Sequence, residues 1–263
     1  MKKIIVMILA LVMLMSTAAM AETFKMGFDA AYPPYSYMDD NGEYTGYDIE
    51  MCQAVCKILG WELELVPINW DTKLITLDAM EHDCIWSGLT IDVLDPEAYT
   101  ISMAYSNNSQ VILTKEGYGI NTLADLEGKT VGVQLGTSAD IMLQEDQAEL
   151  AATFAGGAAL TFEDYNVCFT ELMAGSIQAV AIDFPVAMNK IAEYGDEYYI
   201  LDESLASEQY GICFRKDDTE MCAAVEGAFM QLVEDGTYKA LAEKYGLDTA
   251  ALILLPAEEA AAE

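Results

Sequence analysis

The sequence predicts an α/β protein made of two lobes, each a mostly parallel sheet flanked by helices. Short apolar runs alternate with longer amphipathic segments along the chain, and this alternation is typical of strands connected by helices. The alternation ends in an apolar run at 109–114 and starts again near residue 123. A chain of 263 residues is long enough to form two modest cores.

The first 21 residues have the pattern of a secretory signal peptide. Two lysines precede an apolar run over 4–15, and small residues follow up to Ala21. The apolar run is too short for a membrane span, so we expect cleavage after Ala21 and no span in the mature chain. We therefore expect a periplasmic or secreted protein.

The first half of the remaining chain predicts three strands and two helices. Ile49, Cys52, Val55 and Cys56 recur at the spacing of one buried helix face, and Gly60 ends that helix. The predicted elements are a strand at 23–28, a turn-rich segment at 29–35, a helix at 48–59, a strand at 62–66, a helix at 74–80 and a strand at 84–88.

The second half repeats this rhythm. The predicted strands lie at 109–114, 130–134, 179–182, 199–201 and 209–214. One predicted helix begins at residue 139, and four others span 168–174, 185–192, 221–234 and 238–245. Residues 256–263 form an acidic tail.

Composition excludes several functions. A formal net charge of −32 repels phosphate backbones, so we expect no nucleic-acid partner. The six cysteines contain no C-x-x-C pair and fall in apolar or helical segments, which favours buried thiols. His82, the only histidine, stands between two acids in a predicted solvated turn. We therefore expect no metal and no cofactor.

Eight short motifs occur in an order and at a spacing that point to one family. They are Gly27-Phe-Asp-Ala-Ala-Tyr-Pro-Pro-Tyr, Gly46-Tyr-Asp-Ile-Glu, Asn69-Trp-Asp, Ser87-Gly-Leu-Thr-Ile, Gly132-Val-Gln-Leu-Gly-Thr-Ser, Ala181-Ile-Asp-Phe-Pro-Val-Ala, Gln209-Tyr-Gly-Ile and Asp235-Gly-Thr-Tyr. From about residue 24 to 246, the chain resembles the periplasmic solute-binding proteins of polar amino-acid ABC importers, which are bacterial extracellular solute-binding proteins of family 3 with the type II periplasmic binding fold.

This resemblance implies a domain organisation and a mode of action. Lobe one would comprise 22–112 and 206–255, and lobe two would comprise 113–205. Two crossing strands near 109–114 and 209–214 would form a hinge, and a ligand in the cleft would favour closure. The partners would be a small-molecule ligand, either an amino acid or a related small amine, and the membrane permease of an ABC importer. We expect a monomer.

The resemblance also implies the roles of the residues that bind the ligand. Asp29 would receive a cationic side chain, and Tyr32 and Trp70 would cover the ligand with their rings. Ser87, Gly88 and Thr90 would form a polar cradle. A surface aspartate and ordinary core aromatics are the structural alternatives for the first three positions.

Three further residues complete this expected site in the second lobe. Thr137 and Ser138 open a predicted helix whose N–H groups would bind a carboxylate, although a plain helix cap explains the same residues. Asp183 follows a buried strand and would hold the ammonium group of the ligand.

One departure from the family pattern concerns the ligand's carboxylate. The family normally places an arginine four or five residues after the position of Thr90, where this chain has Leu94 and Asp95. Arg215, the only arginine, lies in a predicted surface turn. Either an amino acid binds through Thr90, Thr137 and a lysine, or the ligand is a small organic cation held in an acidic cleft by Asp29, Asp92, Asp95 and Asp183.

Two other functions stay open at this level. A sensory module for a membrane receptor has the same features, and some dehydratases share the fold. The chain has neither the spacing of a Ser-His-Asp set nor a Cys-His pair, so we expect a binding protein rather than an enzyme.

Overall fold

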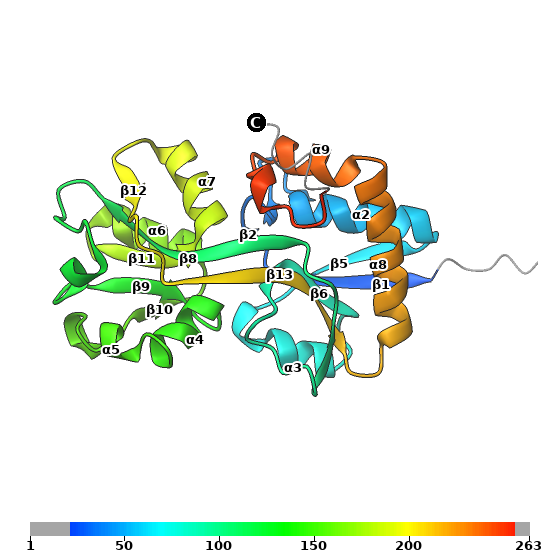
Figure 1. The fold of residues 1–263 in the computed structure, drawn as a ribbon, viewed down its shortest axis with the longest axis horizontal. Coiled ribbons are helices and arrows are strands. Elements are labelled where there is room, and N and C mark those ends of the chain that lie inside the picture. Colours follow the sequence, from blue (N-terminus) through cyan, green and yellow to red (C-terminus); the bar gives the residue numbers. More distant parts are fainter. Residues whose placement is uncertain (1–21, 256–263) are drawn as a thin grey trace, which may run out of the picture.

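The computed structural model describes residues 22–255 and shows two α/β lobes side by side (Figure 1). The first lobe contains the start and the end of the described chain, and the second lobe contains its middle. Each lobe has a sheet covered by helices, as the sequence predicts. The predicted signal peptide and acidic tail lie outside the described residues.

The sheet of the first lobe is parallel at its centre. Strand β1 (Thr23–Phe28) pairs in parallel with β5 (Glu62–Pro67) and with β6 (Cys84–Thr90). Helix α2 (Tyr47–Leu59) buries the predicted apolar face and ends at Gly60, which has a left-handed φ of 71°. A small antiparallel sheet precedes this helix and contains β2 (Ala31–Tyr32), β3 (Ser36–Met38) and β4 (Tyr44–Thr45).

The remaining helices of the first lobe come from two distant parts of the chain. A 3-10 turn (Trp70–Thr72) leads into α3 (Lys73–Asp78), just before β6. Helix α8 (Thr219–Glu234) packs against α2, and α9 (Thr237–Lys244) packs against both of them.

The second lobe repeats the parallel arrangement. Strand β9 (Val131–Gln134) lies between β10 (Leu160–Phe162) and β11 (Ala179–Asp183), and both pair with it in parallel. Four helices accompany these strands: α4 (Ser138–Gln144), α5 (Ala148–Ala151), α6 (Tyr165–Ala174) and α7 (Phe184–Tyr194).

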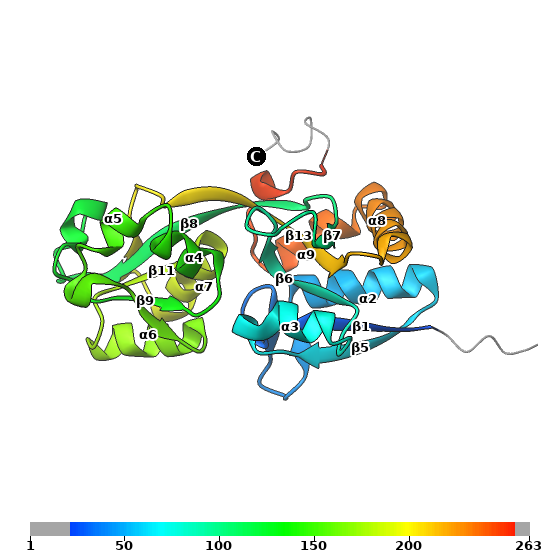
Figure 2. The ribbon, with the colours of Figure 1, turned by 90° about the horizontal axis from the view of Figure 1, so that it is seen from below.

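Two strands of ten residues cross between the lobes. Strands β8 (Ser106–Lys115) and β13 (Ala206–Arg215) are antiparallel and pair with each other near the middle of the molecule. Beyond that point β8 pairs with β11 and β12 (Tyr198–Ile200), and β13 pairs with β6 and β7 (Tyr99–Ile101). Figure 2 shows both strands arching over the space between the lobes. The sheets of the two lobes therefore join into one continuous hydrogen-bonded sheet with the strand order β10-β9-β11-β8-β13-β6-β1-β5.

The structure confirms the expected buried thiols and the expected turn after Arg215, and it corrects the prediction for His82. All six cysteines are free and buried. The predicted solvated turn at His82 is wrong: the imidazole is fully buried, and its ring nitrogens lie 3.0 Å from Cys84 O and Thr76 Oγ1. The predicted surface turn at the end of the last strand lies at 216–217, and Arg215 directly before it has a partly buried guanidinium that lies 3.2 Å from Asp83 and 2.8 Å from Asp218.

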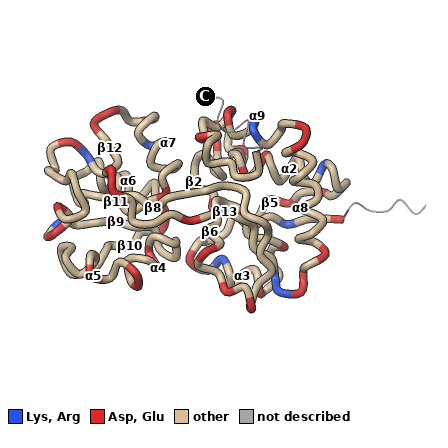
Figure 3. The backbone as a smooth tube through the Cα atoms, viewed as in Figure 1, with Lys and Arg blue, Asp and Glu red and all other residues tan. Residues whose placement is uncertain are grey.

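Aspartate and glutamate residues are spread over both lobes, with few lysine or arginine residues among them (Figure 3). Within residues 22–255, no helix is both long enough and apolar enough to cross a membrane.

Candidate functional site

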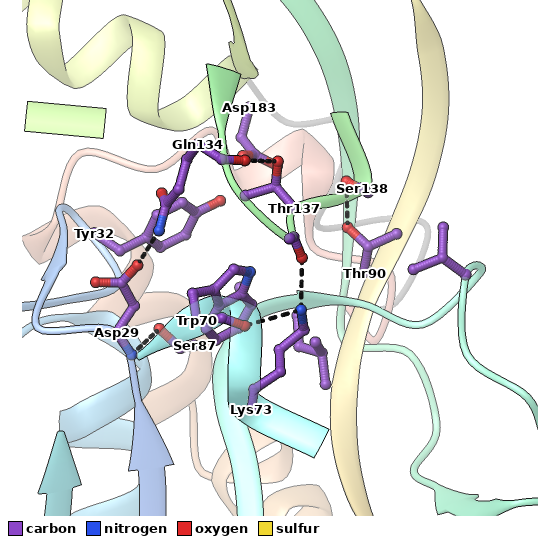
Figure 4. A pocket seen from close by; sticks show the side chains of 14 residues that line it. Asp29, Tyr32, Trp70, Lys73, Ser87, Thr90, Gln134, Thr137, Ser138 and Asp183 are labelled. Atoms are coloured by element: carbon purple, nitrogen blue, oxygen red, sulfur yellow. Dashed lines mark hydrogen bonds between the residues drawn. The ribbon is translucent and has the colours of Figure 1, made fainter. Parts of the chain in front are cut away.

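A pocket lies between the two lobes and is lined by residues of both (Figure 4). The first lobe contributes residues at the ends of β1, β2 and β6 and at the start of α3, and the second contributes the β9–α4 loop and the end of β11. These side chains leave about 20 Å³ between them, which is room for about one water molecule. The lobes are therefore closed onto each other and must separate to admit an organic solute.

Nine of the ten predicted site residues line this pocket, namely Asp29, Tyr32, Trp70, Ser87, Gly88, Thr90, Thr137, Ser138 and Asp183. The exception is Asp95, whose predicted position in the cleft is wrong. Its side chain is exposed and accepts a hydrogen bond from Glu97 N at 2.8 Å in a local turn. The preceding residue, Leu94, is buried, and Val93 lines the pocket instead. Asp92 is exposed as well and accepts from Gln209 N at 2.7 Å.

Asp29 offers a buried carboxylate at the end of β1. Its Oδ1 accepts from Ala31 N at 2.8 Å, and its Oδ2 accepts from Gln134 Nε2 at 2.6 Å across the cleft. Burial raises the pKa of this carboxyl, and the hydrogen bonds to the charged form oppose that rise. Gln134 was not predicted as a site residue, and its Oε1 is buried without a partner among the described residues.

Asp183 belongs to a second acidic group, at the point where β8, β11 and β13 meet. Its Oδ1 accepts from Tyr210 Oη at 2.6 Å, from Asn108 Nδ2 at 2.7 Å and from Gln110 Nε2 at 2.6 Å. The same two amides donate to Glu208 Oε1, at 2.7 and 2.8 Å. Burial raises the pKa of both acids, and their mutual repulsion raises that of Glu208 further.

Glu208 was not identified from the sequence, although a signal for it exists. Along β13 the residues at 208 and 210 are buried and the residues between and before them are more exposed, which is the two-residue alternation of a strand. Glu208 therefore shares a face with Tyr210. It stands behind the pocket wall, where Thr90 Oγ1 donates to it at 2.7 Å.

Two predicted aromatic residues cover the pocket. The Tyr32 hydroxyl lies 2.9 Å from that of Tyr210, which connects the ring to the acidic group. The ammonium group of Lys73 lies over the ring of Trp70, 4.9 Å from the ring centroid. Such ring faces attract cations and cover alkyl chains.

Gly88 must be glycine in this structure. Its φ is +53°, and a Cβ atom there would lie 2.6 Å from the Tyr32 ring. Its N–H donates to Asp48 Oδ2 at 2.6 Å, so α2 fixes the backbone of the polar cradle from behind. Burial raises the pKa of Asp48 to about 7.

The β9–α4 loop is partly occupied by its own residues. Thr137 Oγ1 caps α4 by accepting from Asp140 N at 3.2 Å, and it donates to Gln134 O at 2.8 Å. Gly136 N donates to Asp140 Oδ2 at 3.0 Å. The N–H of Gly136, at the start of this loop, is therefore already bound to a carboxylate of the chain itself.

Lys73 is the cationic residue among those that line the pocket. Its Nζ donates to Trp70 O at 3.2 Å and, across the cleft, to Gly136 O at 2.6 Å. The residue is 9% exposed, and burial lowers its pKa to about 8. The sequence pattern offered no specific reason to single out this lysine, because its burial results from closure against the other lobe.

The residues described by the structure do not bring together three His, Cys, Asp or Glu side chains in a way that could hold a metal ion. What the pocket offers is hydrogen bonding, three acids at or just behind its wall, one lysine and two ring faces.

This closed cleft between two hinged α/β lobes, lined by polar groups from both, defines a solute-binding protein. The profile of the bacterial extracellular solute-binding proteins, family 3, matches residues 24–248. The chain belongs to this family.

Relatives and solved structures agree with that assignment. The L-cystine-binding protein TcyJ of Escherichia coli K12 is 31% identical over 225 residues, which cover 85% of this chain and 82% of TcyJ. An ABC uptake transporter substrate-binding protein from Streptococcus pneumoniae with bound histidine has a TM-score of 0.83 at 29% identity, covering 88% of this chain and 94% of that one. AncCDT-1, an ancestral amino acid-binding protein and precursor of cyclohexadienyl dehydratase, has a TM-score of 0.76 at 32% identity. The match covers 85% of this chain and 95% of AncCDT-1.

Proposed function

We propose that this protein is the extracytoplasmic binding subunit of an ABC importer and captures an α-amino acid with a cationic group between its two lobes. Residues 22–112 and 206–255 would move against residues 113–205 about β8 and β13. The nine pocket residues predicted from the sequence would contact the ligand together with Lys73 and Gln134. The closed monomer would deliver the ligand to a membrane permease, outside the cytoplasm.

The observation that carries this proposal is the distribution of charge in the pocket. Asp29 and Asp183 line it, and Glu208 lies directly behind it; all three are buried, and within residues 22–255 none of them forms a salt bridge. A cationic ligand group supplies the missing partner, and the buried Oε1 of Gln134 accepts a further N–H. Cystine and histidine, named for two of the similar proteins, both carry ammonium and carboxylate groups.

A small amine without a carboxylate is a second candidate. Three acids stand against one lysine at this site, so a ligand with two positive charges is also electrostatically favourable. This candidate ligand differs from the first only in lacking the carboxylate. Comparing the binding of an amino acid with that of its decarboxylated amine therefore distinguishes the two candidates.

Thermal unfolding of the purified mature chain in the presence of candidate ligands tests the proposal. The panel should pair each amino acid with its decarboxylated amine, and the protein should first be unfolded and refolded to remove any carried-over ligand. We expect a rise in melting temperature with a cationic amino acid, because a ligand that binds only the folded state stabilises it. No rise with any member would contradict the proposal. Chemical conversion of a bound ligand would indicate a dehydratase-like enzyme.

A further inference from the structure

We propose that Lys73 holds the carboxylate of the ligand and so replaces the arginine that the family pattern places after β6. This inference rests on the proposed function and specifies the chemistry of its site. It assigns the selection for a carboxylate to one side chain on α3.

The usual position offers no cation here. The turn after β6 carries Asp95 outward into solvent, and Val93 is the residue of that segment that lines the pocket. Arg215 lies at the far end of β13, where Asp83 and Asp218 pair with it. Among the residues that the structure describes, a carboxylate in the pocket therefore has one cationic partner available, the ammonium of Lys73.

The surroundings of Lys73 suit this role. An ammonium group has three donors, and two of them are used by the carbonyls of Trp70 and Gly136. Both of these acceptors are neutral. A carboxylate is a stronger acceptor for an ammonium group than a carbonyl, so a ligand that enters an opened cleft competes well for the Gly136 bond and for the third donor.

The position of Lys73 also fits the rest of the pocket. It stands beside the Trp70 ring, with its ammonium 4.9 Å from the ring centroid, and the charges of Asp71, Asp140 and Asp29 partly oppose the lowering of its pKa by burial. Asp183 approaches the pocket from the other lobe. A ligand that joins Lys73 to Asp183 has separated charges of opposite sign, as an α-amino acid does.

Isothermal titration of variants against a matched ligand pair tests the inference. The pair is the amino acid that stabilises the wild-type protein most and the amine left when its carboxyl is removed, such as L-histidine with histamine. We expect Lys73→Met to weaken amino-acid binding about 100-fold, because one partner of a buried charge pair is lost. We expect it to change amine binding less than threefold. Lys73→Arg should keep the preference for the amino acid.

Lys190→Met is the matched control, because Lys190 is also buried but lies on α7, where it donates to Asn166 at 2.6 Å. It should leave both affinities unchanged. Equal losses for both ligands in Lys73→Met would overturn the inference and indicate a structural role, and so would an unchanged preference. A wild-type protein that binds amines alone would also overturn it, yet would leave solute binding intact. If the wild-type protein binds neither ligand, the proposed function itself fails.

A pH series gives an independent readout. The pKa of Lys73 is about 8, so the charged form is lost as pH rises through that value. Because Lys73 loses its charge, wild-type affinity for the amino acid should fall about fourfold between pH 7 and 8.5. Lys73→Arg stays charged and should lack that fall, while the ammonium of the ligand and the neighbouring acids titrate alike in both proteins. An equal fall in both would count against Lys73.

Discussion

Replacing Asp183 with asparagine should stabilise the ligand-free protein while it weakens ligand binding. Asn108 Nδ2 lies 2.7 Å from an oxygen of Asp183 and 2.7 Å from an oxygen of Glu208, so those two oxygens are no more than twice that distance apart. Two charges at roughly 5 Å repel by about 3 kcal/mol at an effective dielectric constant of 20. Both acids are buried, and no lysine or arginine contacts either of them within residues 22–255.

The size of the gain depends on pH, and its sign follows from the raised pKa values. A buried acid with a raised pKa binds protons more tightly in the folded state, so the stability of the wild-type protein falls as pH rises above the ordinary values of 3.8 and 4.5. The Asp183→Asn variant should therefore lose less stability than the wild-type protein as pH rises. Removing the repulsion should raise the free energy of unfolding by about 1–3 kcal/mol at pH 7.5 and by less at pH 5. The gain is smaller than the full repulsion because the new amide keeps one acceptor but brings donors of its own.

Urea unfolding of the ligand-free protein, followed by tryptophan fluorescence at both pH values, measures this difference. Glu208→Gln is the matched control: it removes the other charge of the pair from behind the pocket wall, so it should give a similar gain with a smaller loss of ligand affinity. An Asp183→Asn protein that is less stable than wild type at pH 7.5 would refute the repulsion argument. So would a gain that is equal at pH 5 and 7.5.

Three further outcomes follow from buried groups outside this pair. The six buried thiols should react with a thiol reagent only after unfolding in guanidinium; rapid reaction of the native protein would contradict the packing. Asp48→Asn should flatten the loss of stability from pH 4 to 7, since the folded-state pKa of Asp48 is about 7, and an unchanged slope would exclude this role. Gly88→Ala should cost about 1–3 kcal/mol in urea unfolding and weaken binding, because alanine is strained at φ +53°; wild-type stability would exclude strain.

The elements that the sequence predicts well are those whose pattern is local. The apolar face of α2, followed by Gly60, places that helix within one residue of its observed start. The apolar run at 84–88 predicts β6, although the strand continues to Thr90. In both cases the residues that determine burial are neighbours along the chain, so periodicity carries the information.

The errors arise where burial depends on contacts distant in sequence. His82 stands between two acids and looks solvated, yet β1 covers it so closely that a Cβ at Gly27 would lie 2.6 Å from the ring. Lys73 has the pattern of an ordinary helix lysine and is buried by Gly136 of the other lobe. The prediction for Asp95 fails for a different reason: it rests on the family position of an arginine, and a local turn directs this side chain outward.

The contacts that hold the lobes together use the groups that a ligand would use, and this limits which solutes can bind tightly. Asp29 is already satisfied by the Gln134 amide, and Lys73 by the carbonyl of Gly136. A ligand gains only the difference between its own hydrogen bonds and those that it replaces. Because both replaced partners are neutral, a charged solute adds a Coulomb attraction to Asp29 or Lys73 that the replaced bonds lack, so it gains from the exchange. A neutral solute of the same size does not, so the closed cleft itself selects for charge.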